Sequence, residues 1–320
     1  MPDLKLGILD FCIPGPDQTA GERLTETLEL AQRAEELGYE RYWLSEHHGP
    51  GVAHASPELL SALILGTTSR IRAGPAGVLL RYYSPHKLAD DARCLEALFP
   101  GRLNLGLARG SVAAEGHDAL LDGRSVGPDS YARKVVALVG HLRGSLSPAH
   151  PLAAVPTCPA GPGLPTIWML GSGTLSAGLA ARLGTAFALS VFLQPVPARP
   201  SDALERYRAR FRPRPTAPLP RCTVAVAGIC ARTEAEATRA LRGHANPHIV
   251  PSVVGTPDQC REQLGELAAA YGVDEVVFAE VSTTADARRR AHDLLAETVG
   301  LDGAHDGRPS PGGSVEVSSG

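Results

Sequence analysis

The sequence predicts an α/β protein with a parallel β-sheet. Short apolar segments of strand character alternate along the 320 residues with segments in which apolar residues recur every three or four positions, as on one helix face. Helix signals mark this alternation: Gly38 provides a stop, and the Ser56-Pro57 and Ser84-Pro85 pairs each provide a capping serine followed by proline. Roughly eight strands alternating with eight helices imply parallel strands with helical crossovers, in a closed barrel or an open doubly wound sheet.

The predicted elements follow one another in regular order over most of the chain. Strands are predicted over residues 4–9, 41–44, 71–80, 102–107, 166–170, 186–192, 221–230 and 274–280. Helices are predicted to end at Gly38, to begin at Ser56-Pro57 and Ser84-Pro85, and to cover residues 130–142, 174–183, 202–211, 234–242, 257–271 and 285–297. The first strand-to-helix turn, residues 10–21, has no GxGxxG motif, which weakens the open-sheet alternative that binds dinucleotides.

Two irregular segments interrupt the alternation. Residues 111–127 are rich in glycine, and residues 148–165 are rich in proline. We interpret both as long loops within one domain over residues 1–300, because the alternation resumes after them. The first, with its glycines and lack of periodicity, is a candidate mobile lid. Residues 301–320 are predicted to be a disordered tail.

The overall composition favours a small-molecule ligand. The formal net charge is -3 and no run of Lys and Arg appears, so neither a nucleic-acid surface nor a basic membrane anchor is expected. No leader-like segment or membrane-spanning apolar run is seen, which predicts a cytoplasmic protein. The six cysteines stand singly without a CxxC pair, so neither a zinc site nor a disulfide framework is expected.

Candidate catalytic residues directly follow the second predicted strand. In an α/β protein ligands bind at the carboxyl ends of the strands, where Ser45-Glu46-His47-His48 lies here. A histidine titrates near neutral pH, and Glu46 or His48 could orient His47 for proton transfer. An equally simple interpretation is that His47 and His48 are ordinary loop histidines without a catalytic role. A metal site is a third interpretation, but no further cluster of possible ligands lies at metal-binding spacing, so no metal is expected.

Three further strand ends carry residues suited to a flat, phosphate-bearing ligand. The glycines of residues 74–78 allow close backbone approach by such a ligand, or a β-bulge. Arg109 can pair with a phosphate or with a loop carboxylate. The small residues Gly171–Thr174 begin a helix, where free N–H groups bind anions, although a plain helix cap has the same pattern. Arg109 and this turn together favour a phosphate.

Five segments resemble the bacterial luciferase-like flavin-dependent monooxygenases, in the order that the family has them. They are residues 40–48 (ERYWLSEHH), 67–74 (TTSRIRAG), 95–107 (LEALFPGRLNLGL), 165–181 and 254–257 (VGTP). The similarity extends from Leu4 to about Glu297. It implies a luciferase-like (β/α)₈ TIM barrel that holds reduced FMN at its carboxyl-end mouth.

The resemblance also assigns roles to single residues. His47 matches the family's active-site histidine and Arg109 its phosphate-binding arginine, while Gly171, Ser172 and Thr174 match its phosphate turn. Gly173 departs from the pattern, because close relatives often have another serine there.

At Ala76–Gly77 the family has a cis peptide bond against the flavin ring. Pro75 precedes it in this chain, so a cis Gly74–Pro75 bond is the competing possibility. Arg81-Tyr82-Tyr83 also departs from the family and suggests a substrate pocket of its own.

The activity implied by the resemblance is that of a two-component monooxygenase. A separate reductase would supply FMNH₂, which reacts with O₂ to a C4a-peroxyflavin and oxygenates a small organic substrate, as in natural-product biosynthesis. Two alternatives are hydride transfer with the deazaflavin F420 and a flavin-binding relative without catalysis. The identity of the substrate depends on the loops at Arg81–Tyr83 and at residues 111–127 and 194–200. The sequences of these loops carry no transferable code for it. The resemblance further implies a homodimer formed through the helices after the second and third strands.

Overall fold

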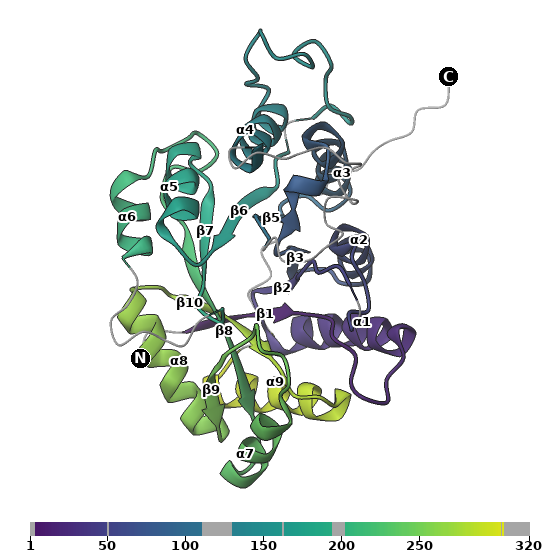
Figure 1. Cartoon of the computed structure of the whole chain (residues 1–320), viewed down its shortest axis with the longest axis vertical. Helices are drawn as coiled ribbons and strands as arrows, with labels where there is room; N and C mark the ends of the chain where they lie inside the picture. The colour runs from purple at the N-terminus through teal and green to yellow at the C-terminus, as the bar shows by residue number, and fades with distance from the viewer. Residues whose placement is uncertain are drawn as a thin grey trace.

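A parallel sheet closed into a barrel forms the centre of the molecule in the computed structural model (Figure 1). The structure describes residues 4–49, 51–110, 130–161, 163–193, 202–301 and 303. The strands are β1 (Lys5–Asp10), β2 (Arg41–Leu44), β3 (Arg72–Pro75), β4 (Val78–Leu79), β5 (Asn104–Ala108), β6 (Thr166–Gly171), β7 (Ala186–Ser190), β8 (Cys222–Cys230), β9 (Pro251–Gly255) and β10 (Glu275–Glu280).

The strand order shows how the barrel closes. The sheet runs β3-β2-β1-β10-β8-β7-β6-β5-β4 with all pairs parallel, and β9 adds to β8 outside this path. A parallel bridge between Ala73 and Leu103 joins β3 to the residues before β5. β3 and β4 therefore act as one interrupted strand, and the predicted (β/α)₈ barrel is confirmed as a closed rather than an open sheet.

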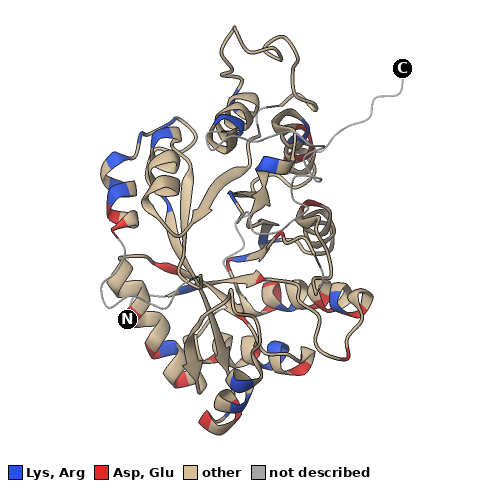
Figure 2. Cartoon of the chain, viewed as in Figure 1, with Lys and Arg blue, Asp and Glu red and all other residues tan. Residues whose placement is uncertain are grey.

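The helices surround the barrel, and two of them begin at the Ser56-Pro57 and Ser84-Pro85 pairs seen in the sequence, although Ser56 makes no side-chain cap hydrogen bond. They are α1 (Ala20–Leu37), α2 (Pro57–Thr67), α3 (Pro85–Leu98), α4 (Ser130–Arg143), α5 (Thr174–Leu183), α6 (Ala203–Arg210), α7 (Glu234–Gly243), α8 (Pro257–Tyr271) and α9 (Ala285–Val299), with a short 3₁₀ turn η1 (Leu80–Tyr82). Ser84 Oγ accepts a hydrogen bond from Lys87 N at 3.4 Å, which fixes the start of α3. Figure 2 shows both signs of charge interspersed over the helices of that view.

Apart from shifts of one or two residues at the ends of elements, two differences separate the predicted from the observed elements. The predicted strand 71–80 is divided into β3 and β4 at Ala76–Gly77, and β9 was not predicted. β9 is five residues long and begins with a proline, so its sequence gives only a weak strand pattern. In the sheet it pairs only with β8. The predicted lid (111–127), the loop 194–200 and the predicted tail, apart from Leu301 and Gly303, lie outside the described residues.

Large side chains from one wall of the barrel fill the space left by small ones on the other. The interior cluster consists of Leu9, Phe11, Trp43, Ala76, Trp168, Leu170, Ala186, Ala188, Phe192, Ala225, Ala227, Ile249, Val277 and Ala279. Trp43 and Trp168 meet edge to face with ring centroids 5.1 Å apart, while β7 and β8 contribute mainly alanine. A larger cluster packs the outer faces of the strands against the helices.

The amino-end base of the barrel is filled by a buried charge. The guanidinium of Arg41 pairs with both carboxylate oxygens of Glu275, with Nη2 2.6 Å from Oε2, and donates to Asn104 Oδ1 at 2.6 Å. It also lies over the rings of Trp43 and Trp168, 5.0 and 4.7 Å from their centroids. These contacts satisfy a charge that is only 1% exposed.

Glycine at position 7 makes room for this arginine. A Cβ atom on Gly7 would lie 2.7 Å from Arg41 Cγ, closer than van der Waals contact permits. The first strand therefore carries glycine where its neighbour β2 carries the buried arginine, since Gly7 and Arg41 are partners in the register.

Replacement of Arg41 by methionine is expected to lower the free energy of unfolding by about 4 kcal/mol, because the Glu275 carboxylate would stay buried without a counter-charge. Arg72→Met is the matched control: Arg72 is the register partner of Arg41 on β3, but its side chain is 38% exposed and pairs with Glu40 at 2.6 Å. The control is expected to cost less than about 1 kcal/mol. Urea unfolding of both variants measures the difference, and equal losses would contradict a special role for Arg41.

Candidate active site

The barrel brings the predicted site residues to one end. All strands are parallel, so the carboxyl ends of β2, β4, β5 and β6 open on the same mouth. His47 follows β2, Arg109 follows β5, and Gly171 is the last residue of β6. The catalytic and cofactor roles given to these residues stay predictions, but their common location is a property of the fold.

His47 is an exposed residue at the barrel mouth and lies beside an aromatic side chain. Its Nδ1 atom is 3.1 Å from Ser45 Oγ, and its ring centroid is 6.1 Å from that of Phe11. Desolvation by the surrounding protein atoms lowers the pKa of His47 below its ordinary value, and the neighbouring imidazoles of His48 and His248 lower it further. A lowered pKa favours the neutral ring, which is the form that can accept a proton.

A buried carboxylate fixes the β1–α1 loop beside His47. Asp10 pairs with Arg23 and accepts hydrogen bonds from Tyr42 Oη at 2.6 Å, Thr27 Oγ1 at 2.9 Å and Cys12 N at 2.7 Å. Burial alone would raise the pKa of Asp10, but the charge of Arg23 and these hydrogen bonds lower it below its ordinary value. Asp10 is thus a charged anchor for the loop that presents Phe11 to the site.

Glu46 connects strands rather than orienting His47. Its Oε1 atom lies 2.6 Å from His48 Nε2 and accepts a hydrogen bond from Tyr83 Oη at 2.8 Å, and its Oε2 atom accepts from Leu79 N at 2.8 Å. Among the hydrogen bonds of the described residues, His47 pairs with Ser45 and not with either neighbour that the sequence suggested. Glu46 joins the end of β2 to β4 and η1, which is the geometry of a positioning residue.

The interruption between β3 and β4 is a cis peptide bond. It lies at Ala76–Gly77, as the resemblance implied, and not at Gly74–Pro75. Ala76 is 6% exposed and belongs to the interior cluster of the barrel, so this residue faces the interior just below the mouth.

The glycines around this bond serve strand packing. A Cβ atom on Gly77 would lie 2.8 Å from the carbonyl carbon of Gly106, and one on Gly74 would lie 1.7 Å from the carbonyl oxygen of Asn104. Both positions therefore need glycine because the β5 backbone approaches them closely. The expected approach of a ligand is not needed to explain either glycine, and that approach stays a prediction.

The strand register places Arg109 beside the small-residue turn. β5 pairs with β6 so that Leu107 stands opposite Met169, and Arg109, the residue after β5, follows near the end of β6 at Gly171. Arg109 is exposed. The guanidinium and the turn thus occupy neighbouring strand ends, as an anion site formed by both requires.

The start of α5 has uncapped backbone N–H groups. Its N-cap is Gly173, which offers no side-chain hydrogen bond, and the hydroxyl-bearing Ser172 and Thr174 on either side are exposed. A Cβ atom on Gly171 would lie 2.4 Å from Ser176 Oγ, so glycine there lets the Ser176 hydroxyl approach the turn. These donors, with the dipole of α5, suit a phosphate.

Sequence reasoning missed a tyrosine at the same strand ends. Tyr131 lies in the first turn of α4, and its buried hydroxyl has no hydrogen-bond partner among the described residues. Burial raises the pKa of Tyr131, and the charge of Arg109 partly opposes this. The helical pattern identified Tyr131 only as part of a helix, although a tyrosine in the first turn after a strand end was an available signal.

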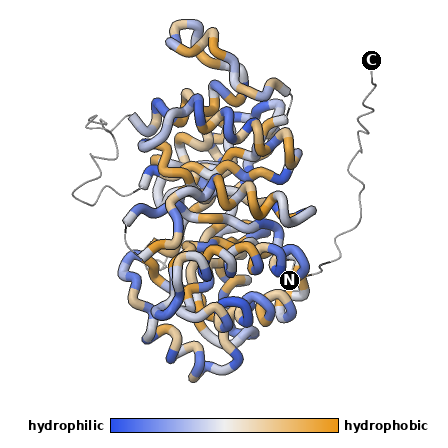
Figure 3. The backbone as a smooth tube through the Cα atoms, turned by 90° about the vertical axis from the view of Figure 1, so that its right-hand side faces the viewer, coloured by the Kyte–Doolittle hydropathy of each residue, from blue (hydrophilic) through white to orange (hydrophobic). Residues whose placement is uncertain are grey.

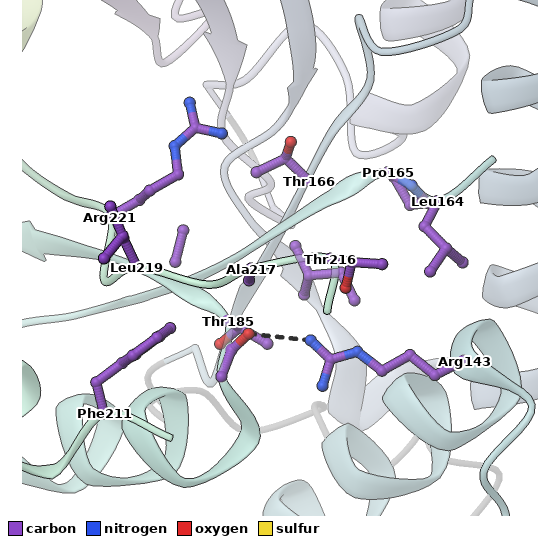
Figure 4. A pocket seen from close by; sticks show the side chains of 13 residues that line it. Arg143, Leu164, Pro165, Thr166, Thr185, Phe211, Thr216, Ala217, Leu219 and Arg221 are labelled. Atoms are coloured by element: carbon purple, nitrogen blue, oxygen red, sulfur yellow. Dashed lines mark hydrogen bonds between the residues drawn. The ribbon is translucent and has the colours of Figure 1, made fainter. Parts of the chain in front are cut away.

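A separate hollow of about 90 Å³ lies at the opposite end of the barrel (Figure 4). It opens at the amino ends of β6, β7 and β8, between Arg143, Phe211 and Arg221. Arg143 is engaged there with the last carbonyls of α5, donating to Leu183 O at 2.5 Å and to Gly184 O at 3.0 Å. This hollow belongs to the base of the barrel and holds none of the predicted site residues.

The structure bears on two further expectations. Over the described ranges, no group of three or more His, Cys, Asp and Glu side chains is arranged to hold a metal ion. In that same part of the chain, every helix is too short or too polar to cross a membrane.

Comparison with known proteins identifies the family. The family model described as luciferase-like monooxygenase matches residues 4–253. The chain belongs to this family. A luciferase-like monooxygenase of Escherichia coli (strain K12) is 30% identical over 307 residues, which cover 92% of this chain and 89% of that protein. Family membership confirms the resemblance seen in the sequence and the expected monooxygenase class of enzyme.

Solved structures of the family share the fold over nearly the whole chain. The crystal structure of apo-MsnO8 is 33% identical and superposes with a TM-score of 0.83, covering 93% of this chain and 99% of that one. The oxygenating constituent of 3,6-diketocamphane monooxygenase from Pseudomonas putida, a Type II Baeyer-Villiger monooxygenase solved with FMN, is 18% identical. Its TM-score is 0.68, with 92% of this chain and 97% of that chain covered. At that identity the likeness shows the fold alone.

Proposed function

We propose that this luciferase-like enzyme is a two-component monooxygenase that uses reduced FMN and O₂ to oxygenate a small organic substrate. One observation carries the proposal: the anion-binding strand ends of β5 and β6 and the His47 loop after β2 open on one barrel mouth, with Ala76 on the strand between them. Flavin bound across these strands would supply the activation of oxygen. The donors at its phosphate end would be Arg109, Tyr131 and the start of α5.

Apolar side chains border His47 at the barrel mouth. Phe11 and Phe192 meet edge to face with centroids 5.2 Å apart, and together with Ile249 they form an apolar surface at the mouth. Such a surface limits the access of water to a reactive intermediate. The lowered pKa of His47 favours its neutral form, and its hydrogen bond to Ser45, among the described residues, uses Nδ1, which leaves Nε2 to accept a proton from the substrate.

Oxygen consumption tests the activity directly. Protein mixed with chemically reduced FMN and a panel of aldehydes and aromatic compounds is expected to consume O₂ and place one ¹⁸O atom from ¹⁸O₂ in a product. Because the FMN is reduced chemically, the assay does not need the separate reductase. Turnover with reduced F420 and no oxygen uptake would overturn the proposal in favour of hydride transfer. His47→Ala should lose product, whereas an unchanged product yield would refute the role of His47.

The phosphate donors can be tested through cofactor binding alone. Tyr131→Phe and Arg109→Gln should each weaken FMN binding by about tenfold, because each removes a hydrogen bond to a charged group. Binding of riboflavin, which lacks the phosphate, should not change. Tyr271→Phe is a suitable control, since Tyr271 is a buried tyrosine on α8. Fluorescence titration gives the affinities, and a wild-type protein that binds FMN and riboflavin equally would rule out the phosphate site.

The expected homodimer has support in an exposed apolar face. Leu59 and Leu63 on α2 are 66% and 52% exposed, and Leu98 at the end of α3 is 65% exposed. These helices follow the second and third strands of the barrel and lie on the side that Figure 3 turns toward the viewer. Apolar side chains grouped in this way are typical of a subunit interface.

The double variant Leu59→Glu and Leu63→Glu is expected to convert the dimer to a monomer, because it would bury four negative charges in the interface. Leu219→Glu is the control, since Leu219 is 72% exposed at the base of the barrel. Light scattering after gel filtration measures the mass. A wild-type monomer, or a double variant that remains dimeric, would contradict this interface.

A further inference from the structure

Four neighbouring strands end in apolar side chains at the barrel mouth. In the sheet β1 pairs with β10, β10 with β8 and β8 with β7, so their carboxyl ends lie next to one another. The segments that follow these strands place apolar residues in the interior cluster or against it. This group, the apolar arc, consists of Phe11, Ile13, Phe192, Ile249 and Val281. The arc is separate from the strand ends of β5 and β6, where the anion donors lie.

The apolar arc borders the candidate catalytic histidine. Phe11 meets Phe192 edge to face, with ring centroids 5.2 Å apart and an interplanar angle of 73°. The ring of Phe11 also lies beside that of His47, with centroids 6.1 Å apart and an interplanar angle of 58°. A ligand ring held against Phe11 therefore also lies next to His47.

Hydrogen bonds fix the loop that carries Ile249. Val250 N donates to Phe192 O at 2.8 Å, which joins the α7–β9 loop to the segment after β7. Ile249 N donates to Asn246 O at 3.3 Å, and His244 Nε2 lies 3.0 Å from Ile249 O. Ile249 is 6% exposed, so its side chain is held inside the cluster. A residue from a distant part of the sequence thus forms part of the wall at the mouth.

Two members of the apolar arc offer surface to a ligand. Ile13 and Val281 are only partly buried, and both pack against the interior cluster. Their backbones are held in place, because Arg23 Nε donates to Ile13 O at 3.3 Å and Val281 N donates to Gly228 O at 3.1 Å. The rim of the arc is therefore held in shape by backbone contacts.

The carboxylates next to the apolar arc are engaged elsewhere. Asp10, at the end of β1, pairs with Arg23 of α1. Glu280, at the end of β10, accepts hydrogen bonds from Cys230 N at 3.1 Å and Ser282 N at 2.9 Å. An ionised group of a ligand on the arc would lose its hydration without gaining an opposite charge from these groups. The arc therefore suits an uncharged part of a ligand.

We propose that the apolar arc binds an uncharged aromatic ring of the substrate, and that Ile249 is the specificity-determining residue that limits the size of this ring. The proposal rests on the proposed function, because it places the substrate beside the candidate catalytic histidine. Phe11 and Phe192 already meet edge to face, and a further aromatic ring can extend this arrangement. Ile249 shares its cluster with the small side chains Ala225 and Ala227 of β8, so its own size decides how much space remains there.

Calorimetric titration without a reductant tests the arc independently of turnover. The probes are 2-naphthol, its saturated analogue decahydro-2-naphthol and the charged 2-naphthoate. The wild type should bind 2-naphthol about tenfold more tightly than 2-naphthoate, because the carboxylate would be desolvated without a partner. It should also prefer 2-naphthol to the saturated analogue, which has no aromatic edge or face. No saturable binding of 2-naphthol, or binding of either other probe that is equally tight, would overturn the proposal.

Substitutions of Ile249 in opposite directions test the size limit. Ile249→Ala should raise the affinity for the larger 9-phenanthrol relative to 2-naphthol by about tenfold, because the lost side-chain volume opens space beside Ala225 and Ala227. Ile249→Phe should lower the same ratio, because the larger side chain fills that space. Damage to the loop would weaken the binding of both probes in both variants and would not move their ratio in opposite directions.

Val253→Ala is the matched control. Val253 lies on β9, which follows the loop, but its buried side chain belongs to the outer cluster. This variant removes buried aliphatic carbon from the same region without opening the arc, so the ratio of the two affinities should stay as in the wild type. A ratio that is unchanged in both Ile249 variants, or that moves as far in Val253→Ala, would contradict the role of Ile249.

Turnover links the arc to the reaction. In the oxygenation assay Ile249→Ala should lower the KM of larger aromatic substrates relative to smaller ones, in parallel with the binding ratio. A binding ratio that changes while the ratio of KM values does not would refute the role of Ile249 in specificity. Absence of FMN-dependent oxygen uptake in the wild type would instead refute the proposed function, whereas the titrations would still decide whether the arc binds an aromatic ring.

Discussion

Arg41 places a full positive charge inside a barrel whose interior is otherwise largely apolar. Glu275 and Asn104 must lie at the same level to satisfy it, Trp43 and Trp168 must flank it, and Gly7 must leave room for its stem. This group fills the amino-end base of the barrel. A ligand can then enter the interior only from the carboxyl ends of the strands, where His47 and the anion-binding turn lie.

Strand β2, which carries Arg41, connects the base of the barrel to its mouth. Along β2, Arg41 and Trp43 face the interior, whereas Tyr42 points outward and donates to Asp10, the anchor of the β1–α1 loop. Glu46, two residues after the strand, binds β4 and η1. Arg41, Asp10 and Glu46 therefore each have a structural partner. The β2 segment that fills the base of the barrel also fixes the loop that carries His47.

Local signals in the sequence predicted the helices and most strands, because serine caps, glycine stops and apolar periodicity act within a few residues. β2 and α8 were predicted with the bounds that the structure has. What depends on closure of the barrel was missed. The contact of Gly77 with the β5 backbone and the hydrogen bond from Val250 N to Phe192 O both join segments that are distant in the chain.

The carboxylates near the barrel mouth are poorly placed to balance a positive charge on His47. Asp10 is paired with Arg23, and Glu46 accepts three hydrogen bonds, so both are already engaged. Glu58 lies near Glu46, and burial raises its pKa, which makes it a weaker counter-charge still. A proton gained by His47 would therefore be stabilised best by negative charge on the ligand itself. Proton transfer to His47 and charge development on a substrate would then favour each other.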